Sequence, residues 1–376
     1  MRCYLCGVCL LLLAMGVLLF QQDSGESQRR STTVQRKDNI KQKFIPAKTV
    51  AFASPIKNAS HVENEEFDWK SRLQFFVLGA QKAGTTSLHK YLGQHPHIVP
   101  PYPKETRCWN YRYNENDPYC KKYFATARFR EKYPNYITGD FSPGYISAQH
   151  VIPRIKDTYP SARFIVSLRD PVERAFSQYK MNYRNGKVNP GDSFDSLCLS
   201  ELEIFRKEGL LSHWIFPADL SNTSEGMSES KMMEMYMLAK VNSTELVRNF
   251  ASPAMLKSWG KLQVDKKSKN FLRTGLYALH IRDWMTTFPK DQFLIINFHD
   301  MSRDTNGVMK RIHTHLGLPH IPLNDTKPTN TALEHSTENP EMSNQMQQIL
   351  VKLFDAFDSM IAVVLEDEKW KDPWNR

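Results

Sequence analysis

Short apolar runs alternate along this chain with segments whose apolar residues recur every three to four positions. The first run, Leu73 to Leu78, is rich in aromatic and β-branched residues, which favours a buried parallel strand over a surface helix. Leu88, Tyr91 and Leu92 then follow the spacing of one helical face, and Gly93 marks the end of that helix. The pattern predicts a strand, a sharp turn and a helix in succession.

The same order of elements returns from Phe164 to Tyr183, with stronger signals for the start of the helix. Asp170 can cap the helix, Pro171 suits its first position, and Glu173 can complete a capping box. The apolar face of this helix comprises Val172, Ala175, Phe176 and Tyr179. The chain therefore has a second strand, turn and helix, with Arg169 at the carboxyl end of the strand.

Apolar patterning continues in the C-terminal half of the chain. From Leu272 to Asp300 it predicts a helix with Trp284 and Phe288 on one side, followed by an apolar strand. A last predicted helix has apolar residues at Met346, Ile349, Leu350, Leu353, Phe354, Phe357, Ile361 and Val364. Strands that alternate with helices predict an α/β fold with a central parallel sheet.

The N-terminal part of the chain lacks this alternation. Cys3 to Phe20 carries no charge and follows Arg2, as in a signal-anchor transmembrane helix, and at ~1.5 Å per residue it spans roughly 27 Å. A cleaved signal peptide is the alternative. We predict a type II anchor over residues 1–20, a polar and flexible stem over residues 21–70, and one lumenal domain over residues 71–376.

The turn after the first strand carries the first candidate chemistry. Gly79 and Gly84 allow an anion to approach the backbone, and the amides at the start of the following helix would point at that anion. A Walker A loop places lysine directly after the second glycine, whereas this chain has Thr85 there and Lys82 inside the loop. That difference argues against a magnesium-dependent nucleotide hydrolase. The candidate anion-binding residues are Lys82, Ala83, Gly84, Thr85, Thr86 and Ser87.

Arg169 offers a second candidate anion site. In an open α/β sheet, ligands bind at the carboxyl ends of the strands, and Ser177 lies two helical turns along the next helix on about the same side as the cap. An ion pair with Asp170 or Glu173 is the structural alternative for this arginine. Two half-sites in this order favour the anion-binding interpretation.

A candidate base lies between the two half-sites. Lys104 to Trp109 follows a loop rich in proline and histidine, and it contains Glu105. A carboxylate here can take a proton from a substrate hydroxyl, while Lys82 can stabilise charge that develops on a leaving oxygen. A surface salt bridge from Glu105 to Lys104 or Arg107 is the alternative interpretation.

Together these motifs resemble those of sulfotransferases, whose donor is 3′-phosphoadenosine-5′-phosphosulfate (PAPS) and which need no metal. The loop around Lys82 resembles their 5′-phosphosulfate loop, and Arg169 with Ser177 resembles their 3′-phosphate motif. Lys104 to Trp109 resembles the K-E-x-x-[FW]-[FW] segment of Golgi glycosaminoglycan sulfotransferases. The resemblance runs from about Gln74 to Trp370, is close to N-acetylgalactosamine 4-sulfate 6-O-sulfotransferase-like enzymes, and implies a P-loop NTPase-like three-layer fold.

The resemblance also implies roles for individual residues. Glu105 would be the base and Lys104 would lie near the sulfuryl group. Lys327 and Asn330 fall where the family closes a loop over the 3′-phosphoadenosine of the donor. Cys108 departs from the family pattern, because it replaces the first aromatic residue of the segment.

Two histidines and a short segment need separate interpretation. Other Golgi sulfotransferases use a histidine base, but His95 and His97 flank a proline at the end of a helix, where a capping or packed role is expected. Some glycan sulfotransferases carry E-K-T-P where Asp140 takes the place of the glutamate and Phe141 that of the lysine. A lysine role is therefore not transferred to this segment.

Net charge and sequons agree with a lumenal enzyme that has an acidic partner. The formal net charge is +10 at pH 7, which in the lumen suits an acidic polysaccharide better than nucleic acid. N-glycosylation sequons occur at Asn58, Asn222, Asn242 and Asn324. We therefore expect a Golgi membrane protein.

The cysteines fall into two groups. Cys3, Cys6 and Cys9 belong to the predicted anchor, and Cys108, Cys120 and Cys198 to the predicted lumenal domain. Cys108 and Cys120 are the nearer pair for a disulfide, although sequence alone leaves the pairing open. The Cys and His residues have no zinc-ligand spacing.

The sequence thus predicts a PAPS-dependent carbohydrate O-sulfotransferase that acts on a glycosaminoglycan, with chondroitin or dermatan favoured. A related enzyme with another acceptor, such as heparan, another glycan or tyrosine, is the nearest alternative. A relative that binds polysaccharide or nucleotide without catalysis is the alternative from a different class.

Overall fold

The computed structural model describes residues 70–110, 113, 120, 123–124, 136–220, 226–264, 270–329 and 340–374. Within these ranges no helix is long and apolar enough to cross a membrane. The predicted anchor over residues 1–20 lies outside the described residues, as does the predicted stem up to residue 69.

Four parallel strands form the central sheet, in the order β2-β1-β3-β6. They are β1 (Leu73–Gly79), β2 (Thr138–Asp140), β3 (Arg163–Leu168) and β6 (Phe293–Asn297). The chain passes from β1 to β2 on one side and then returns to β3 on the other side of β1. In open α/β sheets ligands bind where the strand order reverses, which here is at the carboxyl ends of β1 and β3.

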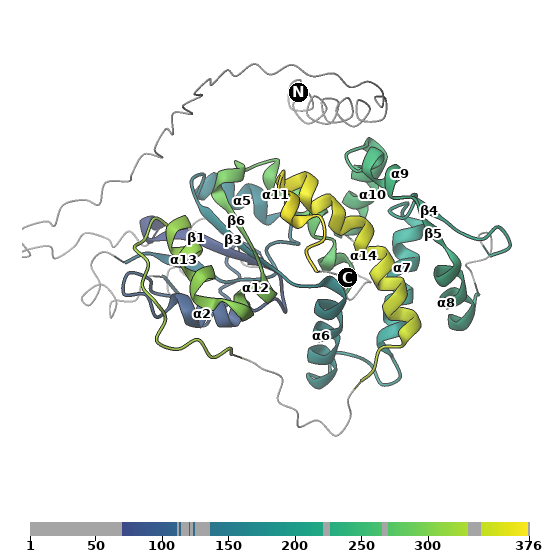
Figure 1. The fold of residues 1–376 in the computed structure, drawn as a ribbon, viewed down its shortest axis with the longest axis horizontal. Coiled ribbons are helices and arrows are strands. Elements are labelled where there is room, and N and C mark those ends of the chain that lie inside the picture. The colour runs from purple at the N-terminus through teal and green to yellow at the C-terminus, as the bar shows by residue number, and fades with distance from the viewer. Residues whose placement is uncertain are drawn as a thin grey trace, which may run out of the picture. The chain divides into compact units, whose positions relative to one another are not determined.

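Helices cover both faces of the sheet, which confirms the predicted three-layer arrangement (Figure 1). One face carries α2 (Thr85–Leu92), α12 (Phe298–Arg303) and α13 (Thr305–His315), and the other carries α5 (Val151–Thr158) and α11 (Tyr277–Met285). Along β1, Phe75 and Val77 pack in the hydrophobic core on the face covered by α2, α12 and α13. Phe76 and Leu78 pack in the core on the face covered by α5 and α11. Because Phe75 to Leu78 are buried on both faces of the sheet, this part of β1 is a continuous apolar run, whereas Gln74 is exposed.

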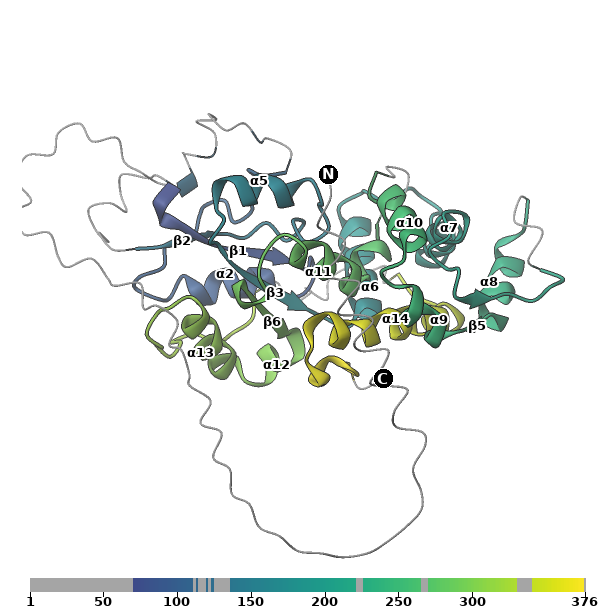
Figure 2. The ribbon, with the colours of Figure 1, turned by 90° about the horizontal axis from the view of Figure 1, so that it is seen from above.

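A helical region lies beyond one end of the sheet (Figures 1 and 2). It contains α6 (Pro171–Arg184), α7 (Phe194–Lys207), α8 (Glu229–Leu238), α9 (Ser243–Asn249), α10 (Pro253–Val264) and α14 (Asn344–Leu365). Two short strands, β4 (Trp214–Ile215) and β5 (Lys240–Val241), pair in antiparallel fashion. The 3-10 helices are Lys70–Arg72, Arg273–Gly275, Lys290–Gln292 and Glu368–Trp370. The long helix α14 packs against α11, α8 and α6, and so joins this region to the helices that cover the sheet.

The local signals in the sequence set most helix boundaries. Helix α2 ends at Leu92 with Gly93 as its C-cap, as predicted. At the start of α6 the Asp170 carboxylate accepts hydrogen bonds from the amides of Val172 (2.8 Å) and Glu173 (3.0 Å), which confirms the predicted cap. In α14 every predicted apolar position is buried except Val364, which is half-buried.

Candidate active site

The phosphate-binding loop leaves the carboxyl end of β1 and enters α2 at Thr85. Two hydrogen bonds tie the loop to β3: the amide of Ala80 donates to the carbonyl of Ser167 (2.7 Å), and the Ser167 hydroxyl donates to the carbonyl of Ala83 (2.7 Å). Gly84 has φ 78°, and a Cβ there would lie 2.5 Å from Met301 Cε and 2.8 Å from the Phe298 ring. The loop is therefore fixed on both sides, with the first amides of α2 at its end.

A Gly84→Ala variant tests how tightly the loop is fixed. We expect the free energy of unfolding to fall by about 2–4 kcal/mol, because the left-handed backbone and the contact with Phe298 both penalise a methyl group. Urea denaturation measures the change. The matched control is Gly260→Ala in α10, where the added Cβ meets open space, and we expect it to be neutral or to stabilise by up to about 1 kcal/mol. Equal stability of the two variants would contradict the expectation.

The two predicted half-sites meet at this edge of the sheet. A guanidinium nitrogen of Arg169 donates to the carbonyl of Lys82 (3.4 Å), and the guanidinium group lies over the Phe298 ring, 5.1 Å from its centroid. Arg169 also forms the ion pair with Glu173 that the structural alternative predicted, at 2.9 Å. The arginine thus contacts the loop and the helix start at once, and its side chain remains 24% exposed.

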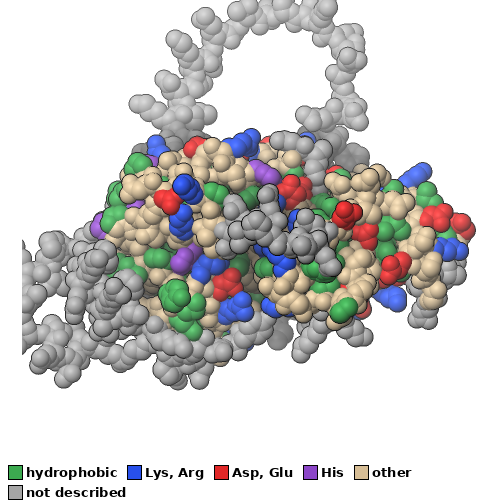
Figure 3. Space-filling model, turned by 90° about the horizontal axis from the view of Figure 1, so that it is seen from below, with side chains coloured by type: hydrophobic (Ala, Val, Ile, Leu, Met, Phe, Trp, Pro, Cys, Tyr) green, Lys and Arg blue, Asp and Glu red, His purple; other side chains and the backbone are tan. Residues whose placement is uncertain are grey.

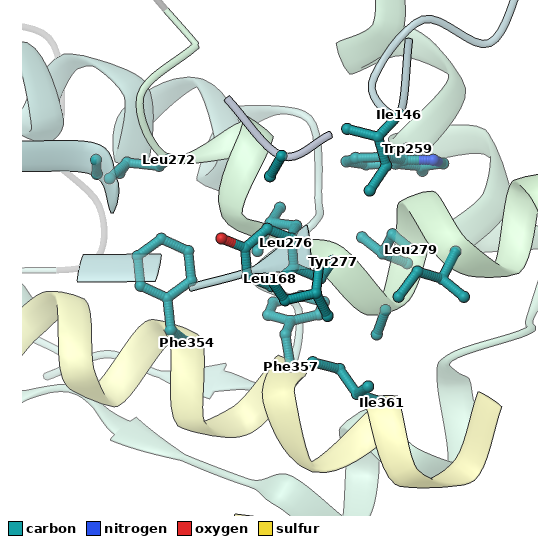
Figure 4. Close-up of a cluster of buried hydrophobic side chains, with 14 of the residues drawn as sticks. Ile146, Leu168, Trp259, Leu272, Leu276, Tyr277, Leu279, Phe354, Phe357 and Ile361 are labelled. Carbon is teal, nitrogen blue, oxygen red and sulfur yellow. The ribbon is translucent and has the colours of Figure 1, made fainter. Parts of the chain in front are cut away.

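The core beneath Arg169 holds its backbone in place. The Tyr277 hydroxyl donates to the carbonyl of Arg169 (2.8 Å). Tyr277 and Leu168 are fully buried in the cluster that Figure 4 shows, to which α14 contributes Phe354 and Phe357. The position of the arginine therefore depends on packing from three separate segments of the chain.

The electrostatic surroundings of Lys82 are positive. Burial lowers the pKa of Lys82 from its ordinary value, and the nearby cations Arg184, Arg169 and Lys180 lower it further. In the described part of the chain no carboxylate forms an ion pair with Lys82. Figure 3 shows Lys and Arg side chains interspersed with carboxylates on the face that it presents. An anionic ligand would relieve the repulsion around Lys82.

Four more of the predicted donor-binding residues follow on α2 and α6. The Thr85 hydroxyl accepts a hydrogen bond from Lys104 Nζ (3.3 Å), which joins the loop to the segment of the candidate base. Thr86 is half-buried in the first turn of α2. Ser87 is buried, and its hydroxyl accepts from the amide of Thr329 (3.0 Å). On α6, Ser177 is half-buried, two turns from the cap.

Lys104 contacts the phosphate-binding loop, and Glu105 pairs with Lys104. Lys104 Nζ is 3.4 Å from a Glu105 carboxylate oxygen, and Arg107 lies 2.8 Å from the other oxygen. The salt bridges of the structural alternative are therefore present. Burial lowers the pKa of Lys104, although the neighbouring Glu105 opposes that shift. The Glu105 side chain is 29% exposed, so solvent and substrate can reach it while Lys104 links it to Thr85.

Of the two rival histidines, His95 takes the packed role that the sequence predicted, whereas the His97 side chain is exposed. His95 is 2% exposed, and its Nε2 lies 3.0 Å from the carbonyl oxygen of Pro319. Its Nδ1 accepts a hydrogen bond from the amide of His97 (3.2 Å), and its ring packs 4.7 Å from that of His313. Both nitrogens of His95 are thus occupied by backbone groups.

Residues 324–329 run along α2. The Tyr91 hydroxyl donates to the carbonyl of Thr326 (2.8 Å), and Lys90 Nζ donates to the carbonyl of Lys327 (3.1 Å). Lys90 also pairs with Asp325 at 2.7 Å. The Lys327 side chain is exposed, and Asn330 lies outside the described residues. The segment reaches Ser87, in the first turn of α2, through Thr329.

Sequence reasoning missed the role of one buried carboxylate. Asp140, at the end of β2, is 0% exposed and accepts hydrogen bonds from three hydroxyl groups. Burial raises its pKa to about 6, although the hydrogen bonds from Ser142, Thr106 and Tyr145 act in the opposite direction. The spacing of Asp140, Ser142 and Tyr145 was visible in the sequence, but Thr106 joins them only in the fold.

A cavity of about 610 Å³ adjoins the Arg169–Glu173 pair. It lies where α6, α12, α14 and the C-terminal segment meet, and it is lined by Asp170, Val172, Glu173, Phe176, Asn297, His299, Ser302, Arg303, Met342, Gln347, Val351, Pro373 and Trp374.

Cys108, three residues after the candidate base Glu105, forms a disulfide with Cys120. This disulfide confirms the nearer of the predicted pairings. Cys198 is buried and free.

The fold and the site define an α/β protein in which the loop between β1 and α2 has the form of a phosphate-binding loop but lacks the Walker lysine. The family model described as "Sulfotransferase domain" matches residues 72–353, and the chain belongs to this family.

Known relatives agree with the resemblance seen in the motifs. The chain is 24% identical over 319 residues to "Membrane-associated sulfotransferase kil1" of Dictyostelium discoideum, a match that covers 79% of this chain and 66% of the relative. It is 25% identical over 362 residues to "Carbohydrate sulfotransferase 15" of Mus musculus, which covers 83% of this chain and 57% of the relative. The chain thus matches less than two thirds of the length of either relative. Among solved structures, a sulfotransferase from Alicyclobacillus acidocaldarius is 21% identical, with a TM-score of 0.47 and coverage of 80% of this chain and 99% of that one.

Proposed function

We propose that this protein transfers a sulfuryl group from PAPS to a hydroxyl group of a glycosaminoglycan, with chondroitin or dermatan as the favoured acceptor. One observation carries the proposal. The loop that bears Lys82 contacts Arg169 where the strand order reverses, and Lys104 contacts Thr85 of the same loop and pairs with Glu105. Three segments that are distant in the sequence thereby bring the candidate anion-binding groups and the candidate base together.

The residues present fit the anionic groups of such a donor. Lys82 and the amides of Gly84 to Thr86 would hold the 5′-phosphosulfate, because a helix start and an unneutralised lysine both attract anions. Arg169 and Ser177 would hold the 3′-phosphate. Lys327 lies on the segment along α2 from which it could approach the nucleotide. We propose that these cations supply the positive charge of the site without a metal.

The proposed reaction is an in-line displacement at sulfur. The acceptor oxygen bonds to sulfur while the bond from sulfur to the phosphate oxygen breaks, and its electron pair stays on that phosphate oxygen. Glu105 takes the proton of the acceptor hydroxyl, and Lys82 and Lys104 stabilise the charge on the leaving oxygen. The ion pairs of Glu105 with Lys104 and Arg107 hold its carboxylate beside Lys104, which itself contacts the loop.

The acceptor class rests on charge and on a relative. Lys104, Arg107, Lys180 and Arg184 surround or adjoin the site, and their charge suits a sulfated or uronic-acid chain. One relative is named a carbohydrate sulfotransferase, which supports a carbohydrate acceptor.

We further propose that the protein is a single-pass type II Golgi membrane protein whose folded domain is lumenal. The uncharged run from Cys3 to Phe20 supports an anchor, and a disulfide between Cys108 and Cys120 suits the oxidising secretory pathway. Protease protection in sealed microsomes tests the topology. Digestion of the folded domain without detergent would rule the proposal out.

The full chain, incubated with PAPS that carries labelled sulfate, tests the activity. The acceptor panel contains chondroitin, dermatan, desulfated heparin and a tyrosine peptide. Label on chondroitin or dermatan alone supports the proposal in full. Label on heparin or on the peptide keeps the reaction and replaces the acceptor, whereas label on none, with the desulfated donor product still bound, favours a binding protein.

A further inference from the structure

Asp140 is the centre of a buried hydrogen-bond network that includes Thr106, the residue after the candidate base Glu105. Its Oδ1 accepts a hydrogen bond from the Ser142 hydroxyl (2.6 Å), and its Oδ2 accepts from the hydroxyls of Thr106 (2.6 Å) and Tyr145 (2.9 Å). All four residues are at most 2% exposed. A buried carboxylate is tolerated only when its oxygens are satisfied in this way.

Each of these hydroxyls also holds the backbone of the segment that follows Glu105. The amide of Arg107 donates to Ser142 Oγ (3.0 Å), and the amide of Cys108 donates to Thr106 Oγ1 (3.4 Å). The amide of Trp109 donates to the hydroxyl of Tyr145 (3.2 Å). A charged carboxylate only accepts hydrogen bonds, so each hydroxyl must donate to Asp140 and keeps its lone pairs for an amide. One carboxylate thereby orders three consecutive amides.

The residue before Glu105 is fixed to the same part of the chain. Lys104 Nζ donates to the carbonyl of Phe141 (3.4 Å), the residue after Asp140, and to the Thr85 hydroxyl (3.3 Å). Arg107 adopts φ 55°, an unfavourable conformation for a residue with a side chain, and its amide is one of those held. Glu105 therefore lies between two points that the end of β2 fixes.

We infer that Asp140 is a positioning residue that acts through Glu105: it holds residues 106–109 so that the Glu105 carboxylate stays beside Lys104 and the phosphate-binding loop. The inference rests on the proposed function, in which Glu105 is the base. It differs from a purely structural role, because it requires a loss of turnover with donor binding retained. A misplacement of about 1 Å at a reacting group can lower a rate by about 100-fold.

An Asp140→Asn variant tests the inference. The side-chain NH2 group of asparagine donates hydrogen bonds, whereas the carboxylate oxygen that it replaces accepts them, so the variant breaks part of the network. We expect kcat to fall by about 100-fold, with the KM for PAPS and the affinity for the desulfated product within about twofold of wild type. The double variant with Glu105→Gln should be no slower than Glu105→Gln alone, because both changes remove the same function. If the double variant is slower than Glu105→Gln by the factor that Asp140→Asn causes on its own, the inference is wrong.

The matched control is Asp283→Asn on α11. This carboxylate also accepts side-chain hydrogen bonds, from Gln149 (2.5 Å) and from Trp259 (2.6 Å), and it has no bond to residues 104–109. We expect it to lower stability while kcat per folded molecule stays within about twofold of wild type. If Asp140→Asn does not fold, Tyr145→Phe removes one bridge and keeps the ring, with an expected loss of at least about tenfold in kcat.

Amide hydrogen exchange gives a readout that does not need activity. In Asp140→Asn we expect faster exchange at residues 107–109 and unchanged exchange at residues 80–87. Unchanged exchange at 107–109, or faster exchange with normal kcat, would overturn the inference. If the wild-type protein transfers sulfate to no acceptor, the proposed function fails, and the exchange result alone then decides whether Asp140 holds this segment.

Discussion

A Lys82→Met variant is expected to lose about 100- to 1,000-fold in kcat/KM for PAPS, the cost of removing one preorganised charged donor from a site of this kind. Methionine keeps an unbranched stem at a position where φ is already 72°, so the change removes the charge and leaves the backbone demand unaltered. The affinity for the desulfated donor product should also fall, because in the proposed site Lys82 would contact the donor's anionic groups in the ground state as well as in the transition state.

The Lys82→Met variant should lose activity but should not lose stability. Burial and three nearby cations lower the pKa of Lys82, which means that the fold disfavours its charged form. That cost is present at neutral pH, where the lysine is charged in the unfolded chain, and it disappears when the charge is removed. The Tm of Lys82→Met should therefore equal or exceed that of wild type.

Initial rates at varied PAPS, calorimetric titration with the desulfated product and thermal unfolding measure the three effects. Lys310→Met is the control, since Lys310 is an exposed lysine on α13. We expect the control to match wild type in all three measurements. A kcat/KM for Lys82→Met within threefold of wild type would exclude Lys82 from donor binding.

A Glu105→Gln variant is expected to lose about 100- to 10,000-fold in kcat, the usual contribution of a general base. Glutamine keeps the size of the side chain and can still hydrogen-bond to Lys104 and Arg107, but it cannot take the acceptor proton. The affinity for the desulfated product should remain within about threefold of wild type, because Glu105 would act on the acceptor and not on the donor.

The same variant separates catalysis from the salt bridges. Exposed ion pairs contribute about 0–1 kcal/mol, so a structural role alone predicts a small change in stability and normal turnover. Glu208→Gln is a close control, because Glu208 is 35% exposed and pairs with Lys261 at 2.7 Å, much as Glu105 pairs with Arg107. Equal activity of the two variants would assign Glu105 to the surface ion pairs.

Part of the site could be predicted because its signals are local. The apolar run of β1, the glycines of the loop and the cap at Asp170 all act within a few residues of themselves. Parallel strands then bring their carboxyl ends to one edge of the sheet, and the hydrogen bond from Arg169 to the Lys82 carbonyl shows that the two predicted half-sites meet there. The ion pair of Arg169 with Glu173 was also predicted, as a structural alternative, and it coexists with that contact.

The Asp140 network could not be predicted in the same way. Thr106 lies 34 positions before Asp140, and Lys104 lies 19 positions after Thr85. No local pattern specifies such pairs, since they depend on how β2 aligns with β1 and on which side chains become buried together. Ser87 illustrates the same limit, because its hydroxyl accepts the amide of Thr329, 242 positions away.

The sequence by itself determined the alternation of strands and helices, the phosphate-binding loop and the cap of α6, because backbone preferences and apolar periodicity act over a few residues. Only the tertiary structure decided which polar groups share a buried environment. It joined Asp140 to Thr106, next to the candidate base, and brought Arg184, Arg169 and Lys180 near Lys82. It also placed Lys104 in contact with Thr85. Burial and proximity in space control hydrogen bonding and pKa, and neither can be read from neighbours along the chain.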